Sequence, residues 1–240
     1  MKFHVLPGDA QVEEFTKTGI EGEMVICREA LIDGDVRAEN LEEFWKVREE
    51  FLAKSYPESK TNYHETVVSQ FEKLSDLPAA AEVNLWFEYE LFCHVNMWFC
   101  VWLLRNSKAE LYRVAPIAQT KDDTWSGFGG LTSEDLKECF DARLKFSDRD
   151  IKLGSELWTA YQDRDYSKLR ELSTTQSACF PYLKEACEAE IEKEIRPKQV
   201  LQELKKDGVE DFGEMYAAFR ERAGVYGFGD DQVRRLLTEI

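Results

Sequence analysis

Two carboxylates interrupt the most apolar run of this 240-residue chain, "EVNLWFEYELFCHVNMWFCVWLL" at residues 82–104. Glu88 and Glu90 lie two positions apart, so they share one face of a strand or converge across a strand-to-helix turn. Two neighbouring carboxylates could bind a divalent ion such as magnesium, or could differ in pKa and divide the acid and base roles of a reaction. We therefore expect Glu88 and Glu90 to be the catalytic residues.

A structural interpretation of the same stretch stays open. Four positions apart on a helix, Glu90 and His94 could form a pair that binds a metal or orients a base. Alternatively, Glu90 could cap a helix that begins after it, and His94 could be a hydrogen-bonded histidine of the core. Asn96 must find hydrogen bonds if it is buried, either as a bridge between elements or as a contact to a ligand. We include Asn96 among the ligand-binding candidates.

Further polar groups occur in the stretches "PGDA" and "CRE". The turn at Gly8 could offer backbone N–H groups to an anion, and Asp9 would cap the following helix or bind a hydroxyl or a metal. Arg28 could hold a phosphate or carboxylate bidentately, or could pair internally with an acid such as Glu29. We expect Gly8, Asp9, Arg28 and Glu29 to bind the ligand. The sequence has neither the GxGxxG pattern of a dinucleotide site nor the GxxxxGK[ST] pattern of a P-loop.

These candidates follow short apolar segments that have the length and composition of strands. Such segments lie within residues 3–7, 23–29, 82–88 and 109–116, and helical patterns separate them. The alternation predicts a Rossmann-like, mostly parallel α/β sheet with flanking helices over residues 1–124. Because ligands bind beyond the carboxyl ends of the strands in such sheets, we expect the candidate residues to face one crevice.

The second half of the chain has a helical pattern. It begins with the glycine-rich loop "DTWSGFGG", which could close over a ligand as a lid or act as a hinge. Thr132 with Asp135, and Ser147 with Asp150, have the spacing of capping boxes. We expect an all-α C-terminal domain over residues 125–240.

The composition limits the possible partners and location. With 31 basic and 47 acidic residues, the net charge is -16, so the average field repels nucleic acids and anionic membranes. We expect neither as a partner, and the first residues do not read as a secretory leader, which predicts a cytoplasmic protein. The six cysteines show no CxxC pair and no spacing typical of metal ligands, which predicts reduced, buried thiols.

Four runs resemble an uncharacterised bacterial family called domain of unknown function 1835: "FHVLPGDA", "VICREALIDGDV", "LEEFWKVREEFL" and "LWFEYELFCHVNMWF". The similarity continues through "YRVAP", "WSGFGGL", "DIKLGSELWTAY" and "FPYLKEA". The family pattern "WFEHDLFCQ" has the same glutamate at the position of Glu88, aspartate in place of Glu90 and glutamine in place of His94. The resemblance therefore favours a functional role for the two acids over one for His94. The resemblance also implies a helical C-terminal domain, winged-helix-like in some members, and it implies no activity.

Two classes of function fit these observations. The first is a protein that binds a phosphorylated or nucleotide-like small molecule at the strand ends, as a metal-assisted hydrolase or transferase. The alternative is a non-catalytic regulatory or adaptor protein whose helical C-terminal half binds a protein partner. The sequence leaves open whether the protein is an enzyme.

Overall fold

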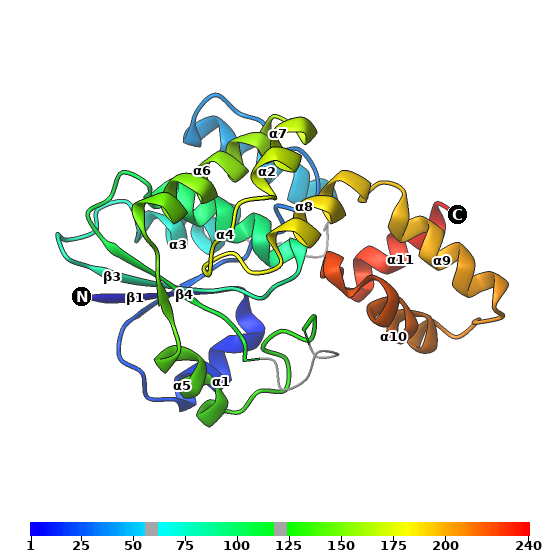
Figure 1. Cartoon of the computed structure of the whole chain (residues 1–240), viewed down its shortest axis with the longest axis horizontal. Coiled ribbons are helices and arrows are strands. Elements are labelled where there is room, and N and C mark those ends of the chain that lie inside the picture. The colour runs from blue at the N-terminus through cyan, green and yellow to red at the C-terminus, as the bar shows by residue number, and fades with distance from the viewer. Residues whose placement is uncertain (56–61, 118–123) are drawn as a thin grey trace.

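The computed structural model describes residues 1–55, 62–117 and 124–240. A five-stranded sheet crosses the molecule in the order β2-β1-β3-β4-β5, and all neighbours are parallel except β4 and β5 (Figure 1). The strands are β1 (Lys2–Leu6), β2 (Glu23–Ile26), β3 (Glu82–Trp86), β4 (Glu110–Val114) and β5 (Leu144–Lys145). The four strands predicted from the sequence are confirmed, as is a mostly parallel α/β sheet.

Helices cover both faces of the sheet (Figure 1). One face carries the short helices α1 (Val12–Lys17), which follows the 3-10 turn η1 (Asp9–Gln11), and α5 (Ser133–Asp141). The other face carries α2 (Leu41–Ser55), the π-helical turn η2 (His64–Val68), α3 (Ser69–Glu72), α4 (Leu91–Leu104) and α6 (Asp148–Gln162). Next to these lie α7 (Tyr166–Leu172) and α8 (Leu183–Glu192).

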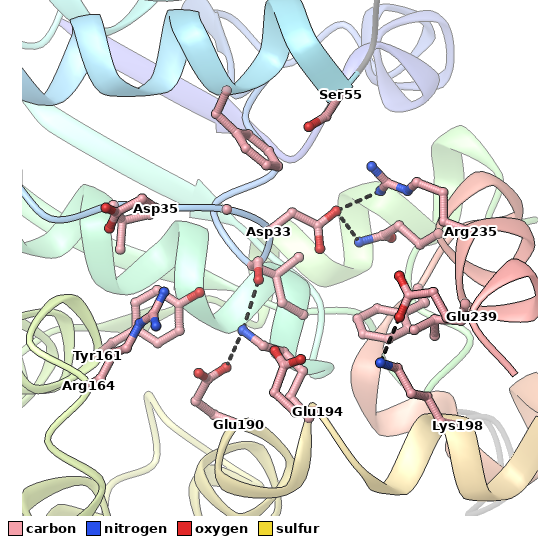
Figure 2. A pocket seen from close by; sticks show the side chains of 18 of the residues that line it. Asp33, Asp35, Ser55, Tyr161, Arg164, Glu190, Glu194, Lys198, Arg235 and Glu239 are labelled. Carbon is pink, nitrogen blue, oxygen red and sulfur yellow. Dashed lines mark hydrogen bonds and ion pairs between the residues drawn. The ribbon is translucent and has the colours of Figure 1, made fainter.

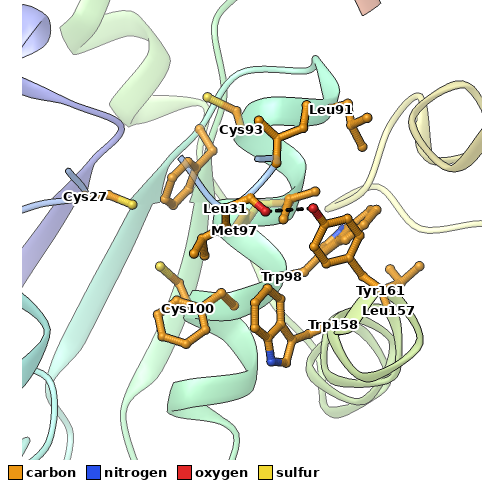
Figure 3. Packing of buried hydrophobic residues seen from close by; sticks show 14 of the residues in the cluster. Cys27, Leu31, Leu91, Cys93, Met97, Trp98, Cys100, Leu157, Trp158 and Tyr161 are labelled. Carbon is orange, nitrogen blue, oxygen red and sulfur yellow. Dashed lines mark hydrogen bonds between the residues drawn. The ribbon is translucent and has the colours of Figure 1, made fainter. Parts of the chain in front are cut away.

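The alternation of side chains along the strands produces two hydrophobic cores. Val5 and Leu85 contribute to the larger core under α4, whereas their neighbours Leu6 and Trp86 contribute to the smaller core under α1 and α5. This pattern is expected for a strand buried on both faces. In the larger core, rings from α4 and α6 pack together, and the hydroxyl of Tyr161 donates to the backbone carbonyl of Leu31 at 2.7 Å (Figure 3).

The helix starts follow their local signals. At the start of α2, the Glu43 N–H donates to Oδ1 of Asn40 at 3.0 Å, so Asn40 caps this helix. The capping boxes predicted at Thr132 and Ser147 are both present, at the starts of α5 and α6. All six cysteines are buried and free, as expected for reduced thiols.

An all-α second half is not confirmed. Leu144 and Lys145 form β5 and pair with Arg113 and Tyr112 of β4, and α6 packs on α4. The strand has only two residues, both exposed, so the sequence shows no alternation of apolar and polar residues that would predict it. The boundary between residues 124 and 125 stays a prediction, and residues 118–123 beside it lie outside the described residues.

The last helices form a group at one end of the molecule, beyond α8 (Figure 1). They are α9 (Arg196–Lys206), α10 (Phe212–Ala223), the 3-10 turn η4 (Gly224–Tyr226) and α11 (Asp230–Thr238). Pro197 lies in the first turn of α9, where proline fits a helix start, and Gly208, with φ +85°, follows the end of the helix. Residues 196–240, which the structure describes throughout, contain no strand that could form the wing of a winged helix.

The topology defines where a ligand is expected. The chain leaves β1 through α1 on one face towards β2, and it leaves β3 through α4 on the other face towards β4. The connections therefore diverge between β1 and β3, and this divergence opens a crevice at the carboxyl ends of these two strands. None of the helices that the structure describes has the length and apolar character needed to span a lipid bilayer.

Candidate functional site

A cavity of about 610 Å³ lies at the carboxyl ends of β1 and β3. Gly8 and Gln11 line it from the β1–α1 connection, and Glu88, Glu90 and Cys93 line it from the β3–α4 connection. The topological rule for open parallel sheets predicts a binding site at this point. The structure thus brings three of the sequence candidates, Gly8, Glu88 and Glu90, into one cavity.

Glu88 is the half-buried acid of this cavity. The backbone N–H of Phe128 donates to its Oε1 at 2.6 Å. Burial, and then the neighbouring charge of Glu90, raise the pKa of Glu88 to about 8, against the attraction of Arg220 and Arg113. Near neutral pH this side chain therefore exchanges a proton readily, or it needs a cation to stay ionised.

Glu90 is the fully buried acid, and it also begins α4. Its Oε1 accepts a hydrogen bond from the backbone N–H of Cys93 at 3.0 Å, so the predicted helix-cap interpretation is confirmed. Burial raises the pKa of Glu90 as well. Capping does not remove Glu90 from the site, since the same carboxylate lines the cavity beside Glu88.

Cys93 completes a group that could hold a metal ion. One ligand atom from each of Glu88, Glu90 and Cys93 lies within 4.8 Å of the other two. Cys93 belongs to the first turn of α4, its backbone N–H donates to the Glu90 carboxylate, and its thiol lies beside the same carboxylate. No sequence signal singles out this cysteine, because the pattern E-x-E-x-x-C lacks the ligand spacing of the common metal motifs.

Two glycine turns enclose the carboxylates. Gly127 has φ +67° and lies so close to the Glu88 carboxylate that a Cβ atom would overlap it. Gly227 has φ +68° and has the same relation to the side chain of Glu90. Both positions therefore require glycine for conformation and for space. The tripeptide Gly-Phe-Gly occurs at residues 127–129 and again at 227–229, and this repeat was the signal for the second turn that the sequence analysis missed.

Gln11 is a second residue that the sequence analysis missed. It is only 8% exposed and it lines the cavity. Neither the nitrogen nor the oxygen of its side-chain amide has a hydrogen-bond partner within the described residues. Buried amides normally satisfy both groups, so the position indicates a polar occupant of the cavity.

Asp9 and Arg28 bind each other. Nε and Nη2 of Arg28 donate to the two carboxylate oxygens of Asp9 at 2.8 and 2.7 Å, and Nη1 donates to the Thr66 carbonyl at 2.9 Å. The hydrogen bond from Arg28 lowers the pKa of Asp9. The internal ion pair that was the alternative for Arg28 is therefore present, with Asp9 as the partner in place of Glu29. Arg28 lines an adjacent cavity of about 450 Å³, which shares Phe92 with the first.

Glu29 and Asn96 lie in the protein interior. The Glu29 carboxylate accepts hydrogen bonds from Arg48 and from the hydroxyl of Tyr63, and the Glu29 and Arg48 side chains are fully buried. Asn96 donates to the Glu29 carbonyl at 2.9 Å and accepts from the Leu31 N–H at 3.3 Å. Asn96 thus forms a bridge between elements, which was one of its two interpretations. Neither Glu29 nor Asn96 lines the cavity between β1 and β3.

Two buried basic side chains, Arg113 and His94, lie close to the two acids. Arg113 on β4 is 1% exposed and donates from Nη2 to the backbone carbonyl of Glu88 at 2.8 Å. Burial, and then the charge of Arg113, lower the pKa of His94 to about 3, so His94 is neutral at ordinary pH. His94 is thus buried as in the structural interpretation, but it is only half satisfied: its Nδ1 lies 3.2 Å from the Glu90 carbonyl, and its Nε2 has no hydrogen-bond partner within the described residues. Arg220 on α10 lines a cavity of about 280 Å³ that also contains Glu88 and Glu90.

Comparison with known proteins adds no relative to this description. Scans against protein-family models, curated proteins and solved structures find no match to the chain.

Proposed function

We propose that the protein binds a phosphorylated or nucleotide-like small molecule at the carboxyl ends of β1 and β3, and that it acts as a metal-assisted hydrolase or transferase. One observation carries the proposal. The half-buried carboxylate of Glu88 and the buried carboxylate of Glu90 line a cavity of about 610 Å³ at the topological switch point of the sheet. A cavity of this size accommodates a small-molecule ligand.

The charge of the cavity supports a metal ion as the link to phosphate. Glu14 lines the cavity together with Glu88 and Glu90, so its walls repel a free phosphate. The raised pKa values of Glu88 and Glu90 reflect two acids that lack full compensation. A divalent ion would stabilise both carboxylates in the ionised form, and its remaining coordination positions would attract phosphate oxygens.

The residues have separate roles in this proposal. A bound divalent ion would polarise the phosphoryl group and neutralise the developing charge. Glu88 and Glu90 would hold the ion, and Arg113 would fix the backbone of Glu88. Arg220, which attracts Glu88 from the side of α10, would face the anionic end of the ligand.

Thermal unfolding with added ions and phosphates tests the proposal. Magnesium, manganese or zinc should raise the Tm of the wild-type protein, because an ion at a hundredfold excess over its Kd stabilises by about 2.7 kcal/mol. ATP, AMP or inorganic phosphate should raise the Tm further only when the metal is present. Glu88→Gln and Glu90→Gln should remove the metal effect.

Glu13→Gln is the matched control, because Glu13 is an exposed acid of α1 that pairs with Lys17. This variant should respond to metals as the wild type does. If no metal and no phosphate shifts the Tm of the wild-type protein, the proposed function is wrong.

A further inference from the structure

We propose that Glu88, Glu90 and Cys93 form a three-residue site for a zinc-class ion, with an open fourth position that faces the cavity. This inference rests on the proposed function, because it names the kind of ion and adds a ligand to the same site. It also departs from the magnesium expected from the sequence.

The arrangement of the three ligands follows from the local structure. Glu90 is the N-cap of α4, and Cys93 is the third residue of the helix, whose N–H donates to the Glu90 carboxylate. This bond holds the first turn of α4 at the Glu90 carboxylate, the thiol of Cys93 lies near the same carboxylate, and Glu88, two residues before the cap, reaches this point from the end of β3. Their ligand atoms lie within 4.8 Å of one another. Zinc bond lengths of about 2.0–2.3 Å place tetrahedral ligand atoms roughly 3.5 Å apart, so small side-chain rotations complete the site.

The donor atoms select the ion. Magnesium prefers six oxygen ligands in octahedral geometry, and a thiolate is a poor ligand for it. Sulfur with two carboxylate oxygens suits zinc, cobalt and related ions. Three protein ligands with an open position are typical of catalytic zinc sites, whereas structural zinc sites have four.

An independent observation indicates that something polar occupies the cavity. The amide of Gln11 is more than nine-tenths buried, it lines the same cavity, and both its polar atoms lack partners within the described residues. This amide still lacks a donor and an acceptor, and a polar occupant of the cavity would supply them. A water or a ligand oxygen at the open position of the ion would lie in the cavity that Gln11 lines.

Cobalt(II) is the probe, because it replaces zinc and reports sulfur ligation. With the full-length protein, cobalt should produce a thiolate-to-cobalt charge-transfer band in the near ultraviolet, and zinc should remove that band. Cys93→Ser should abolish the band and weaken zinc binding by at least about tenfold, since even the loss of an outer partner of a metal ligand has effects of this size. Cys93→Ala tests the same ligand if the serine variant is unstable.

Cys187→Ser is the matched control, because Cys187 is a buried thiol of α8 outside the three-residue group. This variant should keep the band. Metal binding without a thiolate band, with equal zinc affinity in Cys93→Ser, would overturn the zinc-class site and leave the proposed function standing. Absence of all divalent binding in the wild-type protein would remove both.

Discussion

At the scale of single residues, the glycines beside the two acids are constrained to glycine as strictly as the site is to its carboxylates. Gly227 combines a left-handed backbone with a position where a Cβ atom would overlap Glu90. Gly208 has a left-handed backbone too, with φ +85°, but open space around it. Substitution of both glycines therefore distinguishes the cost of backbone strain from the effect of a methyl group on the site.

We predict that Gly208→Ala lowers the free energy of unfolding by about 1–2 kcal/mol, the strain of alanine in the left-handed region, and that Gly227→Ala lowers it by at least as much, because the methyl group also overlaps Glu90. Only Gly227→Ala should also weaken zinc binding, because the methyl group displaces the Glu90 side chain. Urea unfolding and zinc titration measure the two effects. Equal zinc affinity in both variants would show that Gly227 does not position Glu90.

The raised pKa of Glu88 makes stability depend on pH in the metal-free protein. Its pKa is about 8 in the folded chain against a usual 4.5, so the folded state keeps a proton that the unfolded state loses. The Glu88 contribution is therefore most favourable below pH 4.5, declines as the pH rises to about 8, and stays unfavourable above that.

Glu88→Gln should remove this decline, because glutamine does not titrate and still accepts the hydrogen bond from Phe128. With a chelator present, we predict that the variant is more stable than the wild type at pH 9 by on the order of a few kcal/mol, and that the difference is smaller at pH 5. Urea unfolding at the two pH values measures it. A difference that does not change with pH would contradict the raised pKa.

At the scale of elements, Asn96 connects α4 to the segment after β2. Its amide satisfies the backbone of Glu29 and Leu31, and the side chain is fully buried. We predict that Asn96→Leu lowers the free energy of unfolding by about 2–4 kcal/mol, since it leaves two buried backbone groups unpaired. Zinc affinity should change little. Loss of metal or phosphate binding with unchanged stability would instead restore Asn96 as a ligand-binding residue.

The elements that could be predicted from the sequence are those with local signals. The four parallel strands are short apolar runs, and the helix starts at Thr132 and Ser147 carry their caps within four residues. The two-residue strand β5 forms only because β4 offers an edge, so no local pattern marks it. Glu88 and Glu90 could be predicted because polar residues that follow a buried strand lie at the ligand-binding edge.

The rest of the candidate site depends on contacts between distant parts of the chain. Gly227 and Arg220 reach the carboxylates only because the C-terminal helices return to the end of β3. The partner of Arg28 is Asp9, nineteen positions earlier, because β1 and β2 are parallel neighbours whose ends meet. Burial of Gln11 likewise follows from packing, and its residue type alone would predict exposure.

At the scale of the whole molecule, polar contacts hold the C-terminal helices beside the site. These contacts lie around a further, charged cavity of about 560 Å³ (Figure 2). Gln232 and Arg235 of α11 donate to the same oxygen of Asp33 at 2.9 and 2.8 Å. Lys193, just after α8, donates to the Ile32 carbonyl at 2.9 Å. Because Gly227 precedes α11 and contacts Glu90, these bonds also stabilise one wall of the metal site.

We therefore predict that Asp33→Ala speeds hydrogen exchange in residues 224–238 and weakens zinc binding, although Asp33 does not touch the carboxylates. Local openings of this kind need only the loss of a few anchoring contacts. Asp207→Ala is the control, because Asp207 pairs with Arg222 on the exposed surface at 3.1 Å, and such pairs contribute about 0–1 kcal/mol. The control should leave exchange in residues 224–238 and zinc affinity unchanged. If Asp33→Ala speeds exchange but binds zinc as the wild type does, the C-terminal helices are not part of the metal site, and Gly227 only packs against it.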